Sequence, residues 1–178
     1  SEENNNLTKA IYFIENIEKY SQSTDILHNS KLKWLKYNRE LGNLDIVQKE
    51  INTLLSRSDY ETLFLALELE RSKILLSLDE IESARQNLLY IVENNSKKQE
   101  TAESYYLLGL YNIKYNWDLD KAKEYLDKVG LEYSRSIYKE PARELKNTIN
   151  IYQGLETNFR SIVSGDSNIV KIIVDEEE

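Results

Sequence analysis

Hydrophobic residues recur along this chain at intervals of three and four, separated by short polar breaks. The stretch from Thr101 to Tyr133 carries two such stripes, formed by Tyr105, Leu108, Tyr111 and Tyr115 and then by Leu119, Ala122, Leu126 and Val129. This spacing is typical of amphipathic helices that bury one face against a neighbour. Gly109 and Ala122 are the small residues at which the two helices would touch most closely. Asp118 or Asp120 suits the N-cap of the second helix.

The same spacing predicts further helices at Leu7–Tyr20, Ile26–Leu41, Leu44–Leu55, Tyr60–Leu76, Leu78–Val92, 141–152 and Leu155–Val163, with Gly154 as the break before the last. Residues 1–6 are expected to form a flexible polar lead-in. The β-branched run at 169–174 favours a strand within an extended, acidic tail over residues 164–178. With one Pro and five Gly in 178 residues, the chain is predicted to be all-α.

Four Leu-led blocks mark an internal repeat. They begin at Leu7, Leu44, Leu78 and Leu119, which lie 37, 34 and 41 residues apart. The pairs Leu54-Leu55 and Leu88-Leu89 keep the offset of 34. The helix at Leu7 follows the same frame as the helix at Leu119, so the chain is expected to open on the second helix of a repeat. Because Met is absent, we expect the chain to be processed or excised from a longer protein.

The pattern Tyr105-x2-Leu108-Gly109, followed by Ala122-x3-Leu126, resembles the tetratricopeptide repeat. The resemblance covers about residues 7–152. It implies a right-handed α-solenoid of about four helical hairpins over residues 7–163, with a bulge where the interval from Gly109 to Ala122 is one residue long for the family. Arrays of this family bind protein segments or peptides on a concave face lined by the first helix of each hairpin. The groove-facing positions carried over to this chain are Lys36, Arg39, Glu70, Lys73, Tyr106, Ile113 and Lys114.

The junction from Glu132 to Leu145 resembles that of bacterial envelope tetratricopeptide proteins, which include the outer-membrane assembly lipoprotein and the Tol-Pal-associated coordinator. This resemblance implies a scaffold for envelope assembly, in the bacterial periplasm or on the periplasmic face of the outer membrane. Two alternatives remain open at this point. One is a cytoplasmic adaptor, sensor or regulatory domain of a larger multidomain protein. The other is an array that positions or regulates a catalytic domain elsewhere in the same protein.

The amino-acid composition limits which functions are expected of this chain. A net charge of −8 argues against nucleic-acid binding. No apolar run reaches the roughly 18 residues that suggest a membrane span. The absence of Cys excludes disulfides and thiolate metal sites, and His28, the single histidine, is expected on the surface. We therefore expect a non-catalytic protein without metal or cofactor. The 13 Tyr either fill space between helices or line the groove, and the strand at 169–174 offers a route to self-association.

Overall fold

The computed structural model describes residues 2–164, and within this range the chain forms eight α-helices and no strand. The α-helices are α1 (Glu2–Tyr20), α2 (Thr24–Glu40), α3 (Leu44–Leu55), α4 (Phe64–Ser77), α5 (Ile81–Asn94), α6 (Gln99–Tyr111), α7 (Leu119–Glu132) and α8 (Lys139–Val163). A 3₁₀-helix, η1 (Ser58–Leu63), precedes α4, and a π-helix, η2 (Asn112–Asn116), follows α6. The all-α prediction is confirmed for these residues. The expected tail lies outside them except for Ser164, and the expected strand at 169–174 lies wholly outside.

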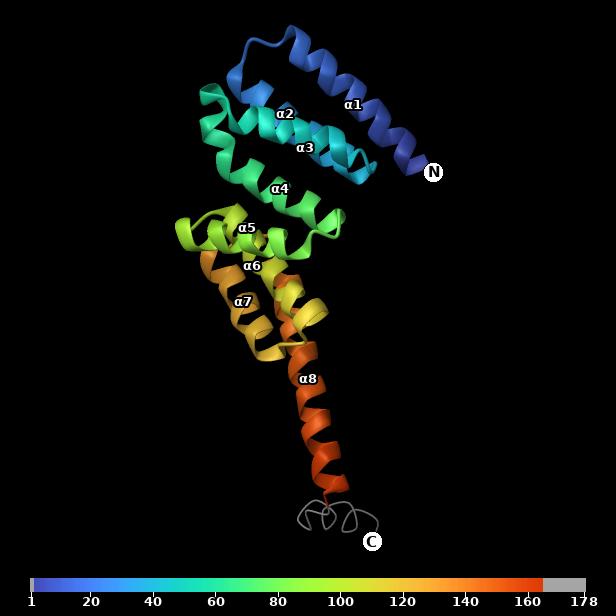
Figure 1. The fold of residues 1–178 in the computed structure, drawn as a ribbon, viewed down its shortest axis with the longest axis vertical. Coiled ribbons are helices and arrows are strands. Elements are labelled where there is room, and N and C mark those ends of the chain that lie inside the picture. Colours follow the sequence, from blue (N-terminus) through green and yellow to red (C-terminus); the bar gives the residue numbers. More distant parts are fainter. Residues whose placement is uncertain (1, 165–178) are drawn as a thin grey trace.

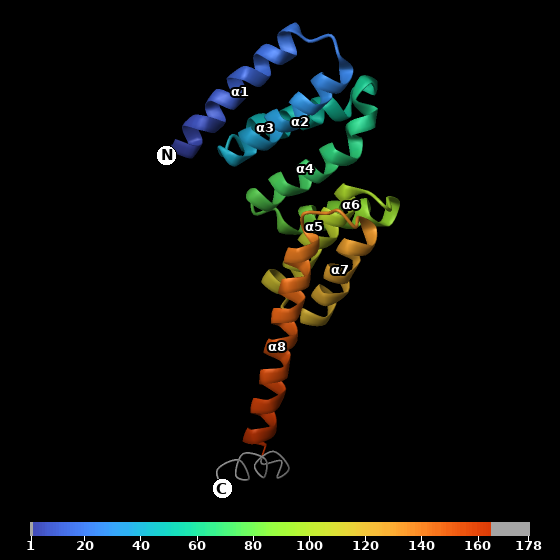
Figure 2. The same cartoon turned by 180° about the vertical axis from the view of Figure 1, so that it is seen from behind.

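The helices form a row in which each one packs on the helix that follows it in the sequence (Figure 1). Further contacts join α2 to α4 and α4 to α6, each skipping one helix. The helices α2, α4 and α6 therefore lie next to one another along one side of the row. The N-terminus and the free end of α8 lie at opposite ends of the molecule, as both views show (Figures 1 and 2).

Buried side chains recur at a nearly constant spacing in α3, α5 and α7. These side chains are Val47, Ile51 and Leu54 in α3, Ala84, Leu88 and Ile91 in α5, and Ala122, Leu126 and Val129 in α7. Equivalent positions lie 37 residues apart from α3 to α5 and 38 apart from α5 to α7. Burial of each large aliphatic side chain contributes about 1.5–3 kcal/mol, so this repeated stripe stabilises the packing of each of the three helices.

The sequence alignment that paired Leu78 with Leu44 and Leu119 is wrong by three residues. Leu78 still belongs to the end of α4, because its N–H donates to the carbonyl oxygen of Ile74 at 2.9 Å. Asp79 then turns the chain with φ at 62°, and α5 begins only at Ile81. The repeat is consequently more regular than the intervals of 37, 34 and 41 suggested.

The helices α6 and α7 approach each other closely at Gly109, as the small residues predicted. Ala122 is fully buried, and a methyl group added to Gly109 would lie 2.8 Å from Leu126 Cδ2. The extra residue expected between Gly109 and Ala122 falls in the wider turn of η2. Asp118 then caps α7, because its Oδ1 accepts the Lys121 N–H at 2.9 Å.

Three predicted boundaries differ from the structure. Residues 2–6, expected as a lead-in, are helical, since α1 begins at Glu2. The segment from Tyr60 begins as the 3₁₀-helix η1 and becomes α-helical only at Phe64. Gly154 does not break α8, which runs without interruption from Lys139 to Val163. One exposed Gly in a helix costs only about 1 kcal/mol, which the continuing backbone hydrogen bonds offset.

Candidate functional site

A groove runs along the side of the molecule formed by α2, α4 and α6. Its central hollow, of about 580 Å³, is lined by Lys36, Arg39, Glu40, Lys73, Leu76, Gln99, Glu103, Leu107, Ile137 and Tyr138. A second hollow of about 240 Å³ shares Lys36, Lys73 and Glu103 with it, and a third of about 200 Å³ shares Leu76 and Leu107. Because neighbouring hollows share lining residues, we treat the three as one surface and call it the groove.

A continuous row of ion pairs and hydrogen bonds forms the polar part of the groove. The Arg39 Nε–H donates to Glu70 Oε2 at 3.0 Å, and Lys73 Nζ lies 2.7 Å from both Glu70 Oε1 and Glu103 Oε1. The Tyr138 hydroxyl donates to Glu103 Oε1 at 2.8 Å. The two cations and the two carboxylates balance, and both carboxylates belong to buried residues. This network joins α2, α4, α6 and the start of α8.

The buried carboxylates constrain how these helices sit against one another. A carboxylate removed from water must be paired, because an unpaired buried charge costs several kcal/mol. Burial raises the pKa of the Tyr138 hydroxyl, and the neighbouring Glu103 carboxylate raises this pKa further. Tyr138 therefore stays neutral and keeps its proton for the hydrogen bond. Its ring stacks on Tyr106 with the centroids 4.9 Å apart, which holds the start of α8 against α6.

The structure brings most of the residues chosen from the sequence to the groove. Lys36, Arg39, Glu70, Lys73 and Lys114 line it. The other two, Tyr106 and Ile113, pack against the hydrophobic cluster of α6, α7 and α8. Lys114, at the far end in η2, lies over the Tyr115 ring at 4.9 Å, and a hydrogen bond with Tyr115 raises the pKa of its ammonium.

Several groove residues were missed by the sequence analysis, among them Glu103, Leu107 and Leu110. The spacing of 37 residues would have found them. It aligns Asn29 with Ala66 and Glu103, Lys33 with Glu70 and Leu107, and Lys36 with Lys73 and Leu110. All nine residues line the groove. The sequence analysis used the unequal intervals of 37, 34 and 41 residues, so these rows were not visible.

The groove changes character along its length. At the α2 end, Lys33 and Lys36 are exposed, and Lys36 has only a distant carboxylate, 3.9 Å away on Glu40. At the α6 end, the equivalent positions are Leu107 and Leu110, followed by Tyr115. The groove therefore offers free positive charge at one end and apolar surface at the other.

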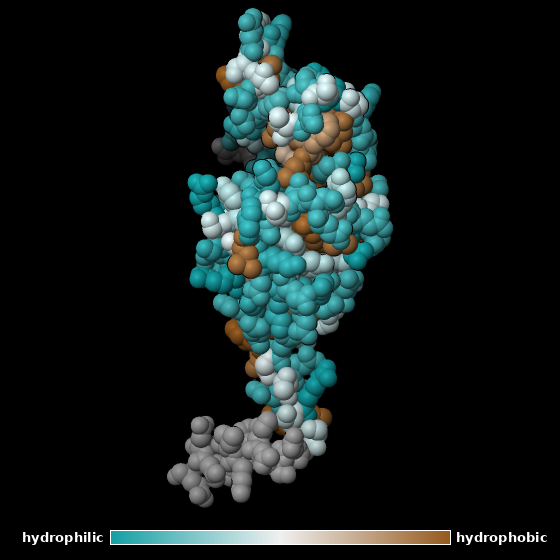
Figure 3. Space-filling model, turned by 90° about the vertical axis from the view of Figure 1, so that its left-hand side faces the viewer, coloured by the Kyte–Doolittle hydropathy of each residue, from teal (hydrophilic) through white to brown (hydrophobic). Residues whose placement is uncertain are grey.

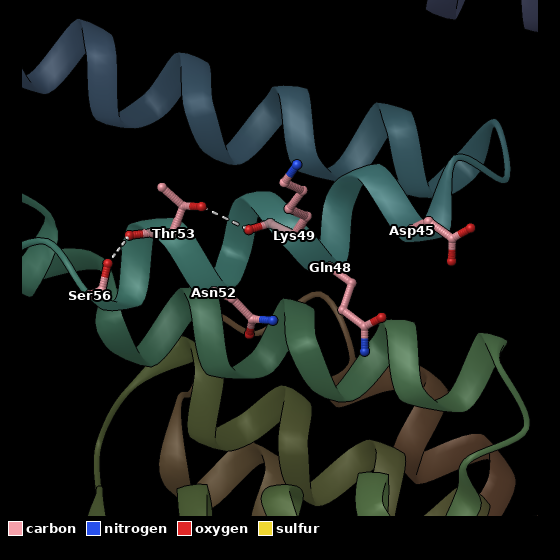
Figure 4. A pocket seen from close by; sticks show the side chains of 6 residues that line it. All are labelled: Asp45, Gln48, Lys49, Asn52, Thr53 and Ser56. Carbon is pink, nitrogen blue, oxygen red and sulfur yellow. Dashed lines mark hydrogen bonds between the residues drawn. The ribbon is translucent and has the colours of Figure 1, made fainter.

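The outer surface of α3 differs from the groove (Figure 4). Its shallow hollow is lined by polar residues of this one helix: Asp45, Gln48, Lys49, Asn52, Thr53 and Ser56. The Thr53 hydroxyl donates to the backbone oxygen of Lys49 at 3.0 Å, and the Ser56 hydroxyl donates to that of Thr53 at 2.7 Å. These hydroxyls are thus engaged by their own helix, and no second element contributes to the lining.

His28 lies elsewhere and is partly buried rather than on the surface as expected. Its Nε2 lies 3.0 Å from the backbone oxygen of Asp59, and its ring packs on Tyr60 with the centroids 4.8 Å apart. These contacts join α2 to η1, so His28 serves the packing of the fold.

Comparisons with known proteins give no relative: no protein-family model, curated protein or solved structure matches this chain. Among residues 2–164, no helix is both long enough and apolar enough to cross a membrane.

Proposed function

We propose that the chain forms a right-handed superhelical array of tetratricopeptide-like hairpins and acts as a non-catalytic scaffold that binds a segment of a partner protein in the groove. The observation that carries this proposal is the groove itself, which equivalent positions of three successive first helices line. The spacing of 37 residues is longer than the 34 of the tetratricopeptide repeat, consistent with hairpins joined by longer turns.

The chemistry of the groove favours a segment with two different ends. Glu70 and Glu103 already have cations, so they offer a ligand little free charge. Lys33 and Lys36 at the α2 end favour acidic residues, whereas Leu107 and Leu110 favour aliphatic or aromatic side chains. The preferred partner is therefore an extended segment with acidic residues followed, or preceded, by apolar ones.

The proposal is tested with peptides selected from a random display library on the immobilised protein. The groove variant is Lys36→Glu with Ile137→Glu, both exposed in the free protein. The matched control is Lys49→Glu with Ile46→Glu on α3, which makes the same charge change at positions that are also exposed. Selected peptides should bind the groove variant at least about tenfold more weakly, a loss of about 1.4 kcal/mol, and the control as tightly as wild type. Equal binding to both variants would contradict the proposal.

The setting we favour is the bacterial periplasm, with a role in envelope assembly. This choice rests on the resemblance of residues 132–145 to bacterial envelope tetratricopeptide proteins. A cytoplasmic adaptor or regulatory domain is the alternative. Fractionation of cells that express the full-length protein, with antibody against this chain, separates the two settings.

A further inference from the structure

The second half of α8 projects from the rest of the molecule as an arm, which we define as residues 151–163 (Figures 1 and 3). From Gly154 onward, its side-chain hydrogen bonds stay within the helix, as between Arg160 and Glu156. The arm nevertheless carries large hydrophobic side chains that are between 42% and 70% exposed: Ile151, Tyr152, Leu155, Phe159, Ile162 and Val163. Only the start of the arm is held by its own chain among the described residues: the Tyr152 ring meets Trp117 edge-on with the centroids 5.7 Å apart, and Gln153 forms hydrogen bonds with Lys123 and Asp120 of α7. The exposed stripe beyond Gly154 has no such contacts there, and a short helical segment is marginal in water without tertiary contacts.

The spacing of these side chains indicates what covers them. Tyr152, Leu155, Phe159 and Ile162 follow one another at intervals of three, four and three residues. This is the a and d pattern of a coiled-coil seam, which is complementary to another helix with a similar seam. Thr157 lies on the opposite face of the helix, where the exposed residues are polar.

The charge of the arm favours a second copy of the same chain as that partner. The whole chain carries a net charge of −8, which opposes contact between copies. The arm contains only Glu156 and Arg160, which cancel and lie 2.5 Å apart as an ion pair. The arm itself is thus a neutral, apolar surface on an acidic protein, so its own charges do not oppose contact between two copies.

The area available is sufficient for a modest dimer. The six apolar side chains of one arm leave on the order of 700 Å² open, so two arms present at most about 1,400 Å², within the range of about 1,200–2,000 Å² buried by stable interfaces. We propose that two copies of this chain associate through their α8 arms, which pair along the seam of Tyr152, Leu155, Phe159 and Ile162. A two-fold axis between the arms closes the assembly at the dimer.

Sedimentation equilibrium of the full 178-residue chain, over about 1–200 µM, tests the inference. The wild-type protein should approach twice its monomer mass of 20.9 kDa. Leu155→Glu with Phe159→Glu should give the monomer mass throughout, whereas Thr157→Glu, the control on the opposite face, should still dimerise. The circular dichroism spectrum and unfolding midpoint of each variant show whether the body remains folded.

A second exposed hydrophobic stripe, on α1, could also join copies, so its variant tests whether the assembly stops at the dimer. Phe13, Ile17 and Tyr20 of α1 are also exposed, at the other end of the row. Phe13→Glu should leave the dimer intact, and the mass should not grow beyond the dimer. The inference is overturned if wild type stays monomeric at 200 µM, if the Leu155 and Phe159 double variant still dimerises, or if Phe13→Glu abolishes association. It does not depend on the groove, so peptide binding and dimerisation can fail separately.

Discussion

Replacing Gly109 by Ala tests the close contact between α6 and α7. An added methyl group would lie 2.8 Å from Cδ2 and 2.9 Å from Cγ of Leu126 on the facing helix. Both distances are shorter than real methyl contacts. Because Cγ is fixed near the backbone of α7, rotation of the terminal methyl groups alone does not remove the overlap. The substitution therefore forces Leu126 out of its position or separates α6 from α7.

The size of the effect follows from two opposing terms. Replacing Gly by Ala inside a helix stabilises the protein by about 0.5–1 kcal/mol, because Gly loses more backbone entropy on folding. Overfilling a packed contact costs about 1–3 kcal/mol. We expect Gly109→Ala to lower the free energy of unfolding by about 1–2 kcal/mol. For a chain of this length, that lowers Tm by roughly 3–6 °C.

Urea unfolding followed by circular dichroism measures the change, with Gly154→Ala as the matched control. Gly154 is also helical, but an added methyl would have nothing within 4 Å, so this substitution should stabilise by up to about 1 kcal/mol. In a Leu126→Ala background, the overlap disappears and Gly109→Ala should itself become stabilising. If Gly109→Ala stabilises the protein with Leu126 in place, the close approach of α6 and α7 is refuted.

Three further results are expected. Asp118→Ala should cost about 1 kcal/mol in urea unfolding, because it removes the cap on the Lys121 N–H, and Asp118→Asn should cost less. Lys73→Ala should cost about 3–5 kcal/mol, since it leaves two buried carboxylates without their shared cation, and adding Glu103→Gln should recover part of the loss. Above about pH 10, tyrosine ionises in the unfolded chain, whereas the raised pKa of Tyr138 keeps its proton in the folded chain. Stability should therefore fall as pH rises above 10, and less steeply in Tyr138→Phe, as unfolding midpoints at pH 9 to 11 would show.

The helices were predictable because their signal is local. An apolar stripe such as Leu119, Ala122, Leu126 and Val129 indicates a buried face whatever the neighbour is, and each predicted helix lies within an observed α-helix along most of its length. Gly109 and Ala122 likewise identified a close contact, because only small residues allow two backbones to approach. The sequence offered both Asp118 and Asp120 as the cap, and the structure shows that Asp118 is the one that caps α7.

Features set by distant contacts were harder to predict. Leu78-Asp79 resembles Leu44-Asp45, yet only the second pair starts a helix, because Leu78 is still bonded to the turn before it. Arg39, Glu70 and Lys73 were nevertheless chosen, because the resemblance to the tetratricopeptide repeat carried over the groove-facing positions of the first helices. Glu103 and Tyr138 were missed, since their role comes from an ion pair and a hydrogen bond that cross between helices.

The corrected frame separates two kinds of position in the repeat. The internal positions, such as Val47, Ala84 and Ala122, are small or aliphatic on α3, α5 and α7, because each is fully buried between adjacent helices. The groove positions do not repeat their chemistry: the row that begins with Lys33 continues with Glu70 and ends with Leu107. Because the side chains that line the groove change from charged to apolar along the row, the two ends of the groove differ. Under the proposed function, we therefore expect an extended partner segment to bind in one orientation, with its acidic end at α2 and its apolar end at α6.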